Sequence, residues 1–321
     1  MEPRLDAGTV ERIEFDIEWP PGTAFAYLLV AEEPILVDAG SPGETGWNAL
    51  ASGISDAGYA PEEIEHLLVT HPHTDHAGQA ATLLDAADPT VYAPVGVRAR
   101  LSRDVDDLAA TVRRNATAAG VPDVEAHVDR AVDSLRRNRA CLPPERIDVE
   151  VAPGERFSAG DTVFEAVHVP GHQENQAAFL TDGLLFAGDA AVEPFRPAAL
   201  HVGFDEGHTE SIDAFYEGLS ALSSVEPDVE RVYPGHGPVF EDLAGAVARD
   251  RESLDSVVAD CRAVVESLGV ATAHEVTAER VGTLDGREYT VFESVGALAR
   301  LRRQGVLDAE TEEGVHRFRP A

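Results

Sequence analysis

Three histidines and an aspartate fall within six positions of the segment "VTHPHTDHAG", residues 69–78. The segment follows the largely apolar residues 64–69, which we expect to form a strand. His71 and His73 are two positions apart, so an extended chain end presents both on one face, and imidazole nitrogen is a favoured zinc ligand. Asp75 and His76 follow on a turn into a helix and can point at a second position nearby. We therefore predict that this one loop contributes ligands to two metal ions.

Ligand-type residues also close three other β-rich runs. His172 follows "FEAVHVPG", Asp189 closes "LLFAGD", and His236 lies in "VYPGHG". In each case a Gly-containing turn carries one such residue, as several strand ends converging on one cleft would require. A single histidine in such a place is most often an ordinary polar residue, but the ordered series favours a metal site. The other histidines are expected to be surface, packing or ordinary polar residues: His66, His127, His168, His201, His208, His274 and His316.

The motifs "THPHTDH", "PGH", "GD" and "PGHG", in this order, resemble the signature of the metallo-β-lactamase superfamily over about residues 10–240. The resemblance implies an α/β fold, an αββα sandwich with the site at one edge. It also implies a first metal held by His71, His73 and His172, a second held by Asp75, His76 and His236, and Asp189 bridging both. Asp38, in "ILVDAG", falls where the family commonly has an acidic residue behind the site, and we expect it to orient a ligand histidine.

Such a pair of metals implies hydrolytic chemistry. Two zinc ions roughly 3.5 to 4 Å apart share a water, lower its pKa toward neutrality and polarise a carbonyl or phosphorus centre above them. We expect two Zn²⁺ per chain, with Fe or Mn as alternatives, and metal-bound hydroxide as the nucleophile. Asp75 is the candidate catalytic proton acceptor in addition to being a ligand.

Departures from related families narrow the substrate. Flavodiiron proteins would carry Glu at His73, and the best-known β-lactamase subclass carries Cys at Asp189. The long insertion of the RNA-processing nucleases is absent. Glyoxalase II resembles the motif set closely, but its glutathione contacts include Lys, and this chain has no Lys. Gln173, Glu174 and Asn175 replace the family's usual turn after His172 and form either the substrate mouth or a polar loop.

Three functions remain open. The first is hydrolysis of a small-molecule ester or thioester by a dinuclear zinc enzyme. The alternative is a metal-dependent endoribonuclease or phosphodiesterase of single-stranded nucleic acid. The third is a mononuclear iron sulfur dioxygenase, which the complete second ligand set disfavours.

The chain divides into three predicted parts. Residues 1–240 form the catalytic domain with a helical insertion at about 95–140, residues 241–267 a connecting helix, and residues 268–321 a winged-helix-like domain with helix, helix and hairpin. This order resembles a subgroup that includes a mitochondrial single-strand endoribonuclease and many hydrolases. The arginines of "LARLRRQG" and "HRFRP" either bind phosphate or belong to a module packed on the cleft. Acidic residues interleaved with these arginines favour packing of the module on the cleft. The helical insertion and the winged-helix-like domain both offer surfaces for a homodimer.

The composition indicates where the protein works. It has 58 acidic residues against 25 basic ones, all arginine, and a net charge of -33, which resembles proteins from salt-loving cytoplasms. No long apolar run or signal-peptide pattern is present, so we expect a cytoplasmic protein without a membrane partner. Cys141 and Cys261 lie outside any CxxC spacing and are expected to be buried or inert thiols.

Overall fold

The computed structural model of the chain describes residues 10–284, 286, 287 and 289–321. Residues 1–9, where no signal peptide is expected, lie outside these residues. Within them, none of the helices has the length and apolar character needed to cross a membrane.

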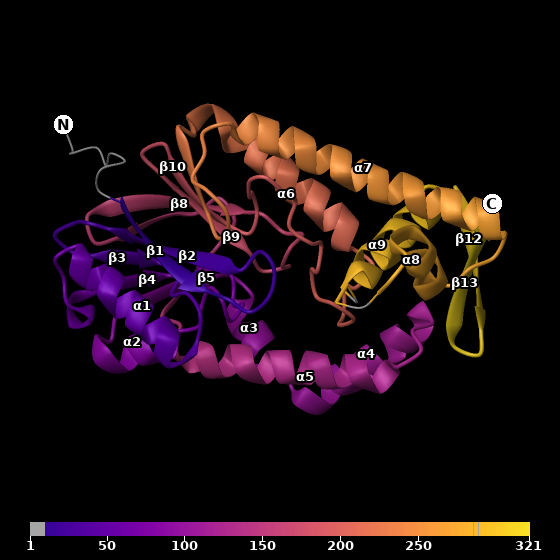
Figure 1. Cartoon of the computed structure of the whole chain (residues 1–321), viewed down its shortest axis with the longest axis horizontal. Helices are drawn as coiled ribbons and strands as arrows, with labels where there is room; N and C mark the ends of the chain where they lie inside the picture. Colours follow the sequence, from indigo (N-terminus) through magenta and orange to yellow (C-terminus); the bar gives the residue numbers. More distant parts are fainter. Residues whose placement is uncertain (1–9, 285, 288) are drawn as a thin grey trace.

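Two sheets form the centre of the molecule (Figure 1). The first sheet consists of β1 (Val10–Asp16), β2 (Thr23–Leu29), β3 (Ile35–Val37), β4 (His66–Leu68), β5 (Thr90–Pro94) and β6 (Val149–Val151), in this spatial order. The second consists of β11 (Arg231–Pro234), β10 (Leu184–Gly188), β9 (Ala177–Thr181), β8 (Thr162–His168) and β7 (Arg156–Ala159). A separate hairpin pairs β12 (Leu307–Glu312) with β13 (Val315–Pro320).

Nine α-helices are found in the described part of the chain. They are α1 (Gly43–Asp56), α2 (Ala80–Ala86), α3 (Val97–Leu101), α4 (Val105–Ala119), α5 (Val124–Cys141), α6 (Ser211–Val225), α7 (Leu243–Leu268), α8 (Ala273–Val281) and α9 (Thr290–Arg303).

Three apolar clusters stack these elements into four layers. One cluster packs Leu50 of α1 and Leu83 of α2 against the outer face of the first sheet. The second lies between the sheets and is rich in aromatic side chains, among them Phe179 and Phe186. The third packs α6 and α7 on the outer face of the second sheet and continues into the C-terminal helices. Because each sheet is covered by helices on one face and by the other sheet on its second face, the predicted αββα sandwich is confirmed.

The helical insertion contains α3, α4 and α5, close to its predicted bounds. The side chain of Asp104 accepts hydrogen bonds from two backbone amides of the first turn of α4 and so caps it. Gly120 ends the same helix in the left-handed conformation, at φ 75°. In Figure 1, α5 and α4 run along the side of the molecule opposite α7, and α4 reaches β13.

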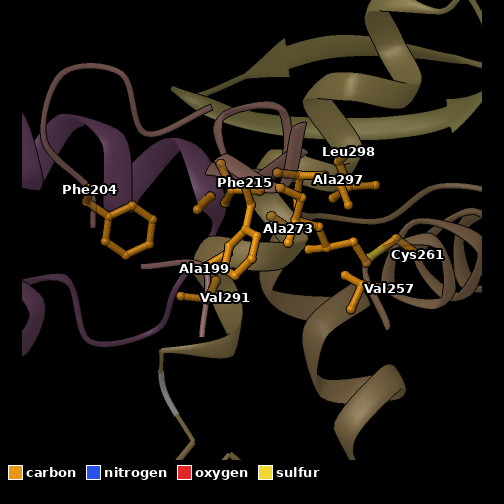
Figure 2. Packing of buried hydrophobic residues seen from close by; sticks show 14 of the residues in the cluster. Ala199, Phe204, Phe215, Val257, Cys261, Ala273, Val291, Ala297 and Leu298 are labelled. Atoms are coloured by element: carbon orange, nitrogen blue, oxygen red, sulfur yellow. The ribbon is translucent and has the colours of Figure 1, made fainter. Parts of the chain in front are cut away.

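The C-terminal unit joins the same core as the catalytic domain. Figure 2 shows side chains from the loop between β10 and α6 and from four helices packed together: Ala199, Phe204, Phe215, Val257, Cys261, Ala273, Val291, Ala297 and Leu298. The predicted order of helix, helix and hairpin is present in α8, α9 and the β12–β13 pair. Cys141 and Cys261 are free and buried, as expected.

A buried carboxyl group on α7 lowers the free energy of unfolding by an amount that depends on pH. Asp250 is 1% exposed, and burial raises its pKa to about 6, although Arg249 beside it partly lowers the value. The folded state therefore keeps the proton until about pH 6, whereas the unfolded chain loses it near 3.8. The cost is absent below the lower value, grows as the pH rises between the two, and is complete above the higher one.

We therefore expect Asp250→Asn to become more stable relative to wild type by about 2 kcal/mol as the pH rises from about 4 to about 7. Urea unfolding of the chelator-treated proteins at both pH values measures the change. Asp260→Asn, at an exposed position on the same helix, is the matched control and should show no comparable change. An equal pH response of both variants would contradict the assignment.

Candidate metal centre

Four strands end at the same edge of the sandwich, and each delivers ligand-type side chains just beyond its last residue. β4 ends at Leu68, ahead of His71 and His73. β8, β10 and β11 end shortly before His172, Asp189 and His236. The parallel pairing of β3 with β4 and of β10 with β11 places these carboxyl ends together. Ligand-type residues from separate motifs of the sequence therefore lie at one site.

The predicted ligand residues come together in three overlapping groups whose ligand atoms lie within 4.8 Å of one another. The groups are His71, His73 and His172; His71, His76 and Asp189; and Asp75, His76 and His236. All of these residues are buried except His73, which is partly exposed. A further group, Glu33, Glu65 and His66, lies apart from the site, with both carboxylates exposed.

The first group brings imidazole nitrogens to one point. His71 Nε2 lies 3.1 Å from His73 Nδ1, and His172 Nε2 lies 3.1 Å from the same atom. Asp189 connects this group with the other. Its Oδ2 lies 3.3 Å from His172 Nε2 and 3.4 Å from His236 Nε2, and its Oδ1 lies 3.3 Å from His76 Nε2. Asp75 approaches His236 Nε2 at 3.5 Å.

The distal ring nitrogens are held from behind by oxygen acceptors. His76 Nδ1 donates to Asp38 Oδ2 at 2.9 Å. His172 Nδ1 donates to the Ala198 carbonyl at 3.0 Å, and His236 Nδ1 donates to the Thr23 carbonyl at 2.6 Å. With Nδ1 engaged on this side, each ring presents its Nε2 to the centre.

Asp38 organises the loop as well as His76. It accepts from the Thr70 amide and the Thr70 hydroxyl, each at 2.8 Å. Because that hydroxyl donates to Asp38, its lone pair is available to accept from His71 Nδ1 at 3.1 Å. Asp38 has φ 58°, a left-handed conformation that Asp tolerates better than most residues. It thus occupies the position behind the site that the resemblance implied.

Burial and neighbouring charges fix the protonation states. Burial lowers the pKa of His73 to about 3 and also lowers the pKa of His71 and His172. Burial acts in the same direction on His76, but Asp189 and Asp38 outweigh it and raise that pKa. Burial opposes ionisation of Asp189, yet His236 and His76 hold its pKa well below the usual range. The centre therefore contains three neutral imidazoles and an ionised carboxylate.

The donor set fits a divalent metal. Buried His76 Nε2 and Asp189 Oδ1 have no hydrogen-bond partner among the described residues, a costly state for buried polar atoms. Three imidazole nitrogens facing one another in the first group likewise lack a positive charge between them. Imidazole and carboxylate ligands, held from behind by hydrogen bonds, match the chemistry of zinc sites.

A cleft of about 710 Å³ opens over the centre, lined by His73, Asp75, His172, Asp189 and His236. Its other walls come from the loop around Trp19, from α5, from residues 195–200 and from the segment before α9. Trp19 and Tyr289 are large exposed side chains at its rim, at 46% and 42% exposure. The insertion and the C-terminal unit therefore both border the site.

A buried ion pair joins the C-terminal unit to the centre. Glu293 of α9 accepts from Arg196 Nη2 at 2.8 Å and from the Ala199 amide at 3.2 Å. The same short segment supplies the Ala198 carbonyl that orients His172. Sequence reasoning missed this contact, because the two charged residues are 97 positions apart.

The polar residues that follow His172 in the sequence differ in their contacts with the centre. Gln173 approaches His73 Nε2 with its side-chain amide at 2.7 Å, so it belongs to the surroundings of the centre. The Glu174 carbonyl accepts from His168 Nε2 at 3.1 Å, and Asn175 is packed beside Gly96. His201 is 4% exposed, so it is a buried residue rather than a surface one. It is not part of the ligand groups.

An αββα sandwich with buried His and Asp ligand groups at one edge is the architecture of a metal-dependent hydrolase. The family model described as "Metallo-beta-lactamase superfamily" matches residues 19–236, more than half of the chain. The chain belongs to this superfamily.

Individual proteins resemble this chain in structure or sequence at low sequence identity. A crystal structure of a metallo-beta-lactamase family protein from Thermus thermophilus is 20% identical, covers 98% of this chain and 99% of its own, and has a TM-score of 0.78. This shows that the fold is shared along almost the whole chain, C-terminal unit included. A probable metallo-hydrolase from Streptococcus pyogenes is 25% identical over 66% of this chain and 78% of its own length.

An atrochrysone carboxyl ACP thioesterase from a Cryptosporiopsis species is 21% identical over 70% of this chain. The chain spans 52% of the length of that thioesterase, and 58% of a further curated relative from Sulfurisphaera tokodaii.

Proposed function

We propose that this protein is a dinuclear zinc hydrolase that cleaves a small ester or thioester. The observation that carries the proposal is a chamber of about 330 Å³ beside the metal cleft, lined mainly by apolar side chains and also by polar ones such as Arg100, His127 and Arg130. Cleft and chamber share His73, Ser134, Asn138, Leu200 and Tyr289 in their walls. A substrate reacting at the ligand groups therefore has an adjoining space for its acyl part.

The chamber suits a hydrocarbon group. Its apolar walls are formed by Leu101, Val112, Leu135, Val202, Phe204 and Phe292. Phe204 packs edge-on against Phe292 at 5.0 Å and against His127 of α5 at 5.2 Å between ring centroids, so the insertion, the loop between β10 and α6, and α9 meet there. Burying an acyl chain in such a space is favourable by about 0.8 kcal/mol per methylene group. The thioesterase among the relatives supports the same substrate class.

Two metals are supported by the ligand geometry. His71, His73 and His172 would hold the first, Asp75, His76 and His236 the second, and Asp189 would serve both. A single iron would leave the second group without a role, which disfavours a mononuclear dioxygenase. When bound, the metals supply an acidified water and polarise the acyl carbonyl.

The chain's own residues then handle the proton. Asp75 faces the cleft and lies against His236. In this proposal water adds to the acyl carbon, the carbon–sulfur or carbon–oxygen bond breaks, and Asp75 passes the water's proton to the leaving atom. The acid and the thiol or alcohol are the products.

Cleavage of single-stranded nucleic acid is less well supported. Arg300 and Arg303 both pair with Asp213, while Arg317 pairs with Glu312 and Arg319 with Glu310 at 2.9 Å and 2.6 Å. Four of the five arginines of the segments "LARLRRQG" and "HRFRP" are therefore engaged within the protein, whereas the Arg302 side chain is exposed and makes no hydrogen bond or ion pair with a described residue. Their pairing favours a module that packs on the cleft over one that binds a phosphate backbone.

The acidic composition supports a salt-rich cytoplasm as the working environment, because salt screens the repulsion among 58 carboxylates. Assays therefore belong in concentrated KCl.

The test is a panel of acyl thioesters and acyl esters with the zinc-loaded protein, alongside end-labelled single-stranded RNA. We expect thioester or ester hydrolysis that EDTA abolishes and zinc restores, with no RNA cleavage. Metal content is measured on the same samples. RNA cleavage without ester hydrolysis, by protein that holds two metals, would overturn the proposal in favour of the nuclease.

A further inference from the structure

The charge on the walls of the cleft is opposite to that of the protein as a whole. The chain has a net charge of -33. Among the described lining residues, the only carboxylates in the cleft are Asp75 and Asp189, which both belong to the ligand groups, and the chamber has none. Arginines, in contrast, line both spaces. The charge of these walls therefore favours binding of an anion more than the charge of the surface in general does.

Most arginines of this chain are held by carboxylates or carbonyls, including two that line these spaces. Arg100 pairs with Asp205, and Arg196 pairs with Glu293. Arg130 and Arg137 differ, because they make no hydrogen bond or ion pair with any residue that the structure describes. Both are exposed residues of α5. Their guanidinium groups are free to bind something from outside the chain.

The spacing on α5 directs these groups to one side. Arg130, Ser134 and Arg137 are four and three positions apart, so they share one face of the helix. Arg130 lines the chamber, Arg137 the cleft, and Ser134 both. Arg287, on the segment before α9, lines the cleft from the C-terminal unit. Arginines thus border the cleft from two separate parts of the chain.

We propose that Arg137 and Arg287 bind a phosphate group carried by the leaving thiol of the substrate, an inference that rests on the proposed thioester hydrolysis. The apolar chamber takes the acyl part, the metal centre takes the scissile carbonyl, and the thiol extends through the cleft mouth. Guanidinium groups bind phosphate through paired, charge-assisted hydrogen bonds. The substrate class is therefore an acyl thioester of a phosphorylated thiol.

The reaction stays balanced without any further reagent. Water adds to the acyl carbon, the carbon–sulfur bond breaks, and the sulfur leaves as a thiol after taking a proton. The phosphate remains intact throughout, because it serves only as a handle. Its contribution is expected in KM rather than in kcat, because an unreacting handle that is bound equally in the ground state and the transition state gives uniform binding.

The experiment uses one acyl group on three thiols: coenzyme A, which carries phosphates, glutathione, which carries carboxylates, and N-acetylcysteamine, which is neutral. Wild type, Arg137→Gln and Arg136→Gln are compared at fixed KCl. Arg136 neighbours Arg137 but pairs with Asp133 and does not line the cleft, so it is the matched control. Unfolding temperatures of all three proteins establish that they are folded.

We expect Arg137→Gln to raise KM for the coenzyme A thioester about tenfold and to change KM for the neutral thioester less than about twofold. Arg136→Gln should resemble wild type. An equal effect of Arg137→Gln on all three thiols, or no effect, would overturn the phosphate site while leaving thioester hydrolysis in place. A larger effect of Arg137→Gln on KM for the glutathione thioester would mean that the site binds a carboxylate rather than a phosphate. Hydrolysis of none of the thioesters would overturn the phosphate site and would restrict the proposed function to ester substrates.

Discussion

Asp189→Asn is expected to lower kcat/KM by about a thousandfold or more and to reduce the bound zinc from the proposed two ions per chain to one or fewer. The substitution keeps the shape of the side chain and removes its charge. Both oxygens of Asp189 face histidines, at 3.3 Å from His76 and His172 and 3.4 Å from His236. A neutral amide would place a hydrogen-bond donor where a second metal needs a ligand oxygen.

The measurement combines steady-state kinetics with metal analysis of protein loaded at a fixed zinc excess. Asp182→Asn is the matched control, because Asp182 lies in the turn between β9 and β10, is exposed, and has φ 46°, which Asn tolerates. The control should retain both metals and wild-type kinetics. Two bound ions and a rate within tenfold of wild type in Asp189→Asn would mean that Asp189 does not join the two groups.

The residues that gather in the site could be predicted from the sequence because their signal is local. Each ligand-type residue follows a short β-rich run and a turn, and parallel strand ends meet at one edge of a sheet. The loop of residues 71–76 alone provides four of them. The αββα sandwich followed from the same motifs by resemblance, and the packing of three apolar clusters confirms it.

The groups behind the ligands had no such signal. The acceptors for His172 and His236 are the backbone carbonyls of Ala198 and Thr23. Every residue type has a backbone carbonyl, so the identity of the residue does not mark these two positions. The pairing of Glu293 with Arg196 was hidden for a different reason, because only the docking of α9 brings the two together.

Short elements were the part of the fold that the sequence indicated least. β6 has three residues, β7 four and α3 five. Such lengths are too short to display a period of 2 or 3.6 residues. β5, β6 and β7 were accordingly absent from the predicted elements, whereas the helical insertion and the connecting helix, α7, lie close to their predicted bounds.

Gly235→Ala is expected to lower kcat/KM by about a hundredfold or more, because a shift of the reacting geometry by about 1 Å already costs that much. A Cβ at this position would lie against Cε1 of His76 and Oδ1 of Asp189, closer than the 3.0 Å that real Cβ atoms keep. Gly235 is outside the positive-φ positions, so its backbone conformation itself accepts alanine.

Neither side of this contact has room to retreat. Gly235 is fixed by hydrogen bonds from its amide to the Gly188 carbonyl at 2.8 Å and from the Phe25 amide to its own carbonyl at 2.9 Å. His76 is fully buried and tied to Asp38. Kinetics, zinc content and the unfolding temperature of metal-free protein are measured together; the rate and the zinc content should fall sharply, and the unfolding temperature should fall as well, because the added Cβ overpacks a rigid contact. Wild-type zinc content and rate would mean that the His76 and Asp189 side chains move aside easily, so that hydrogen bonds from behind do not fix the centre.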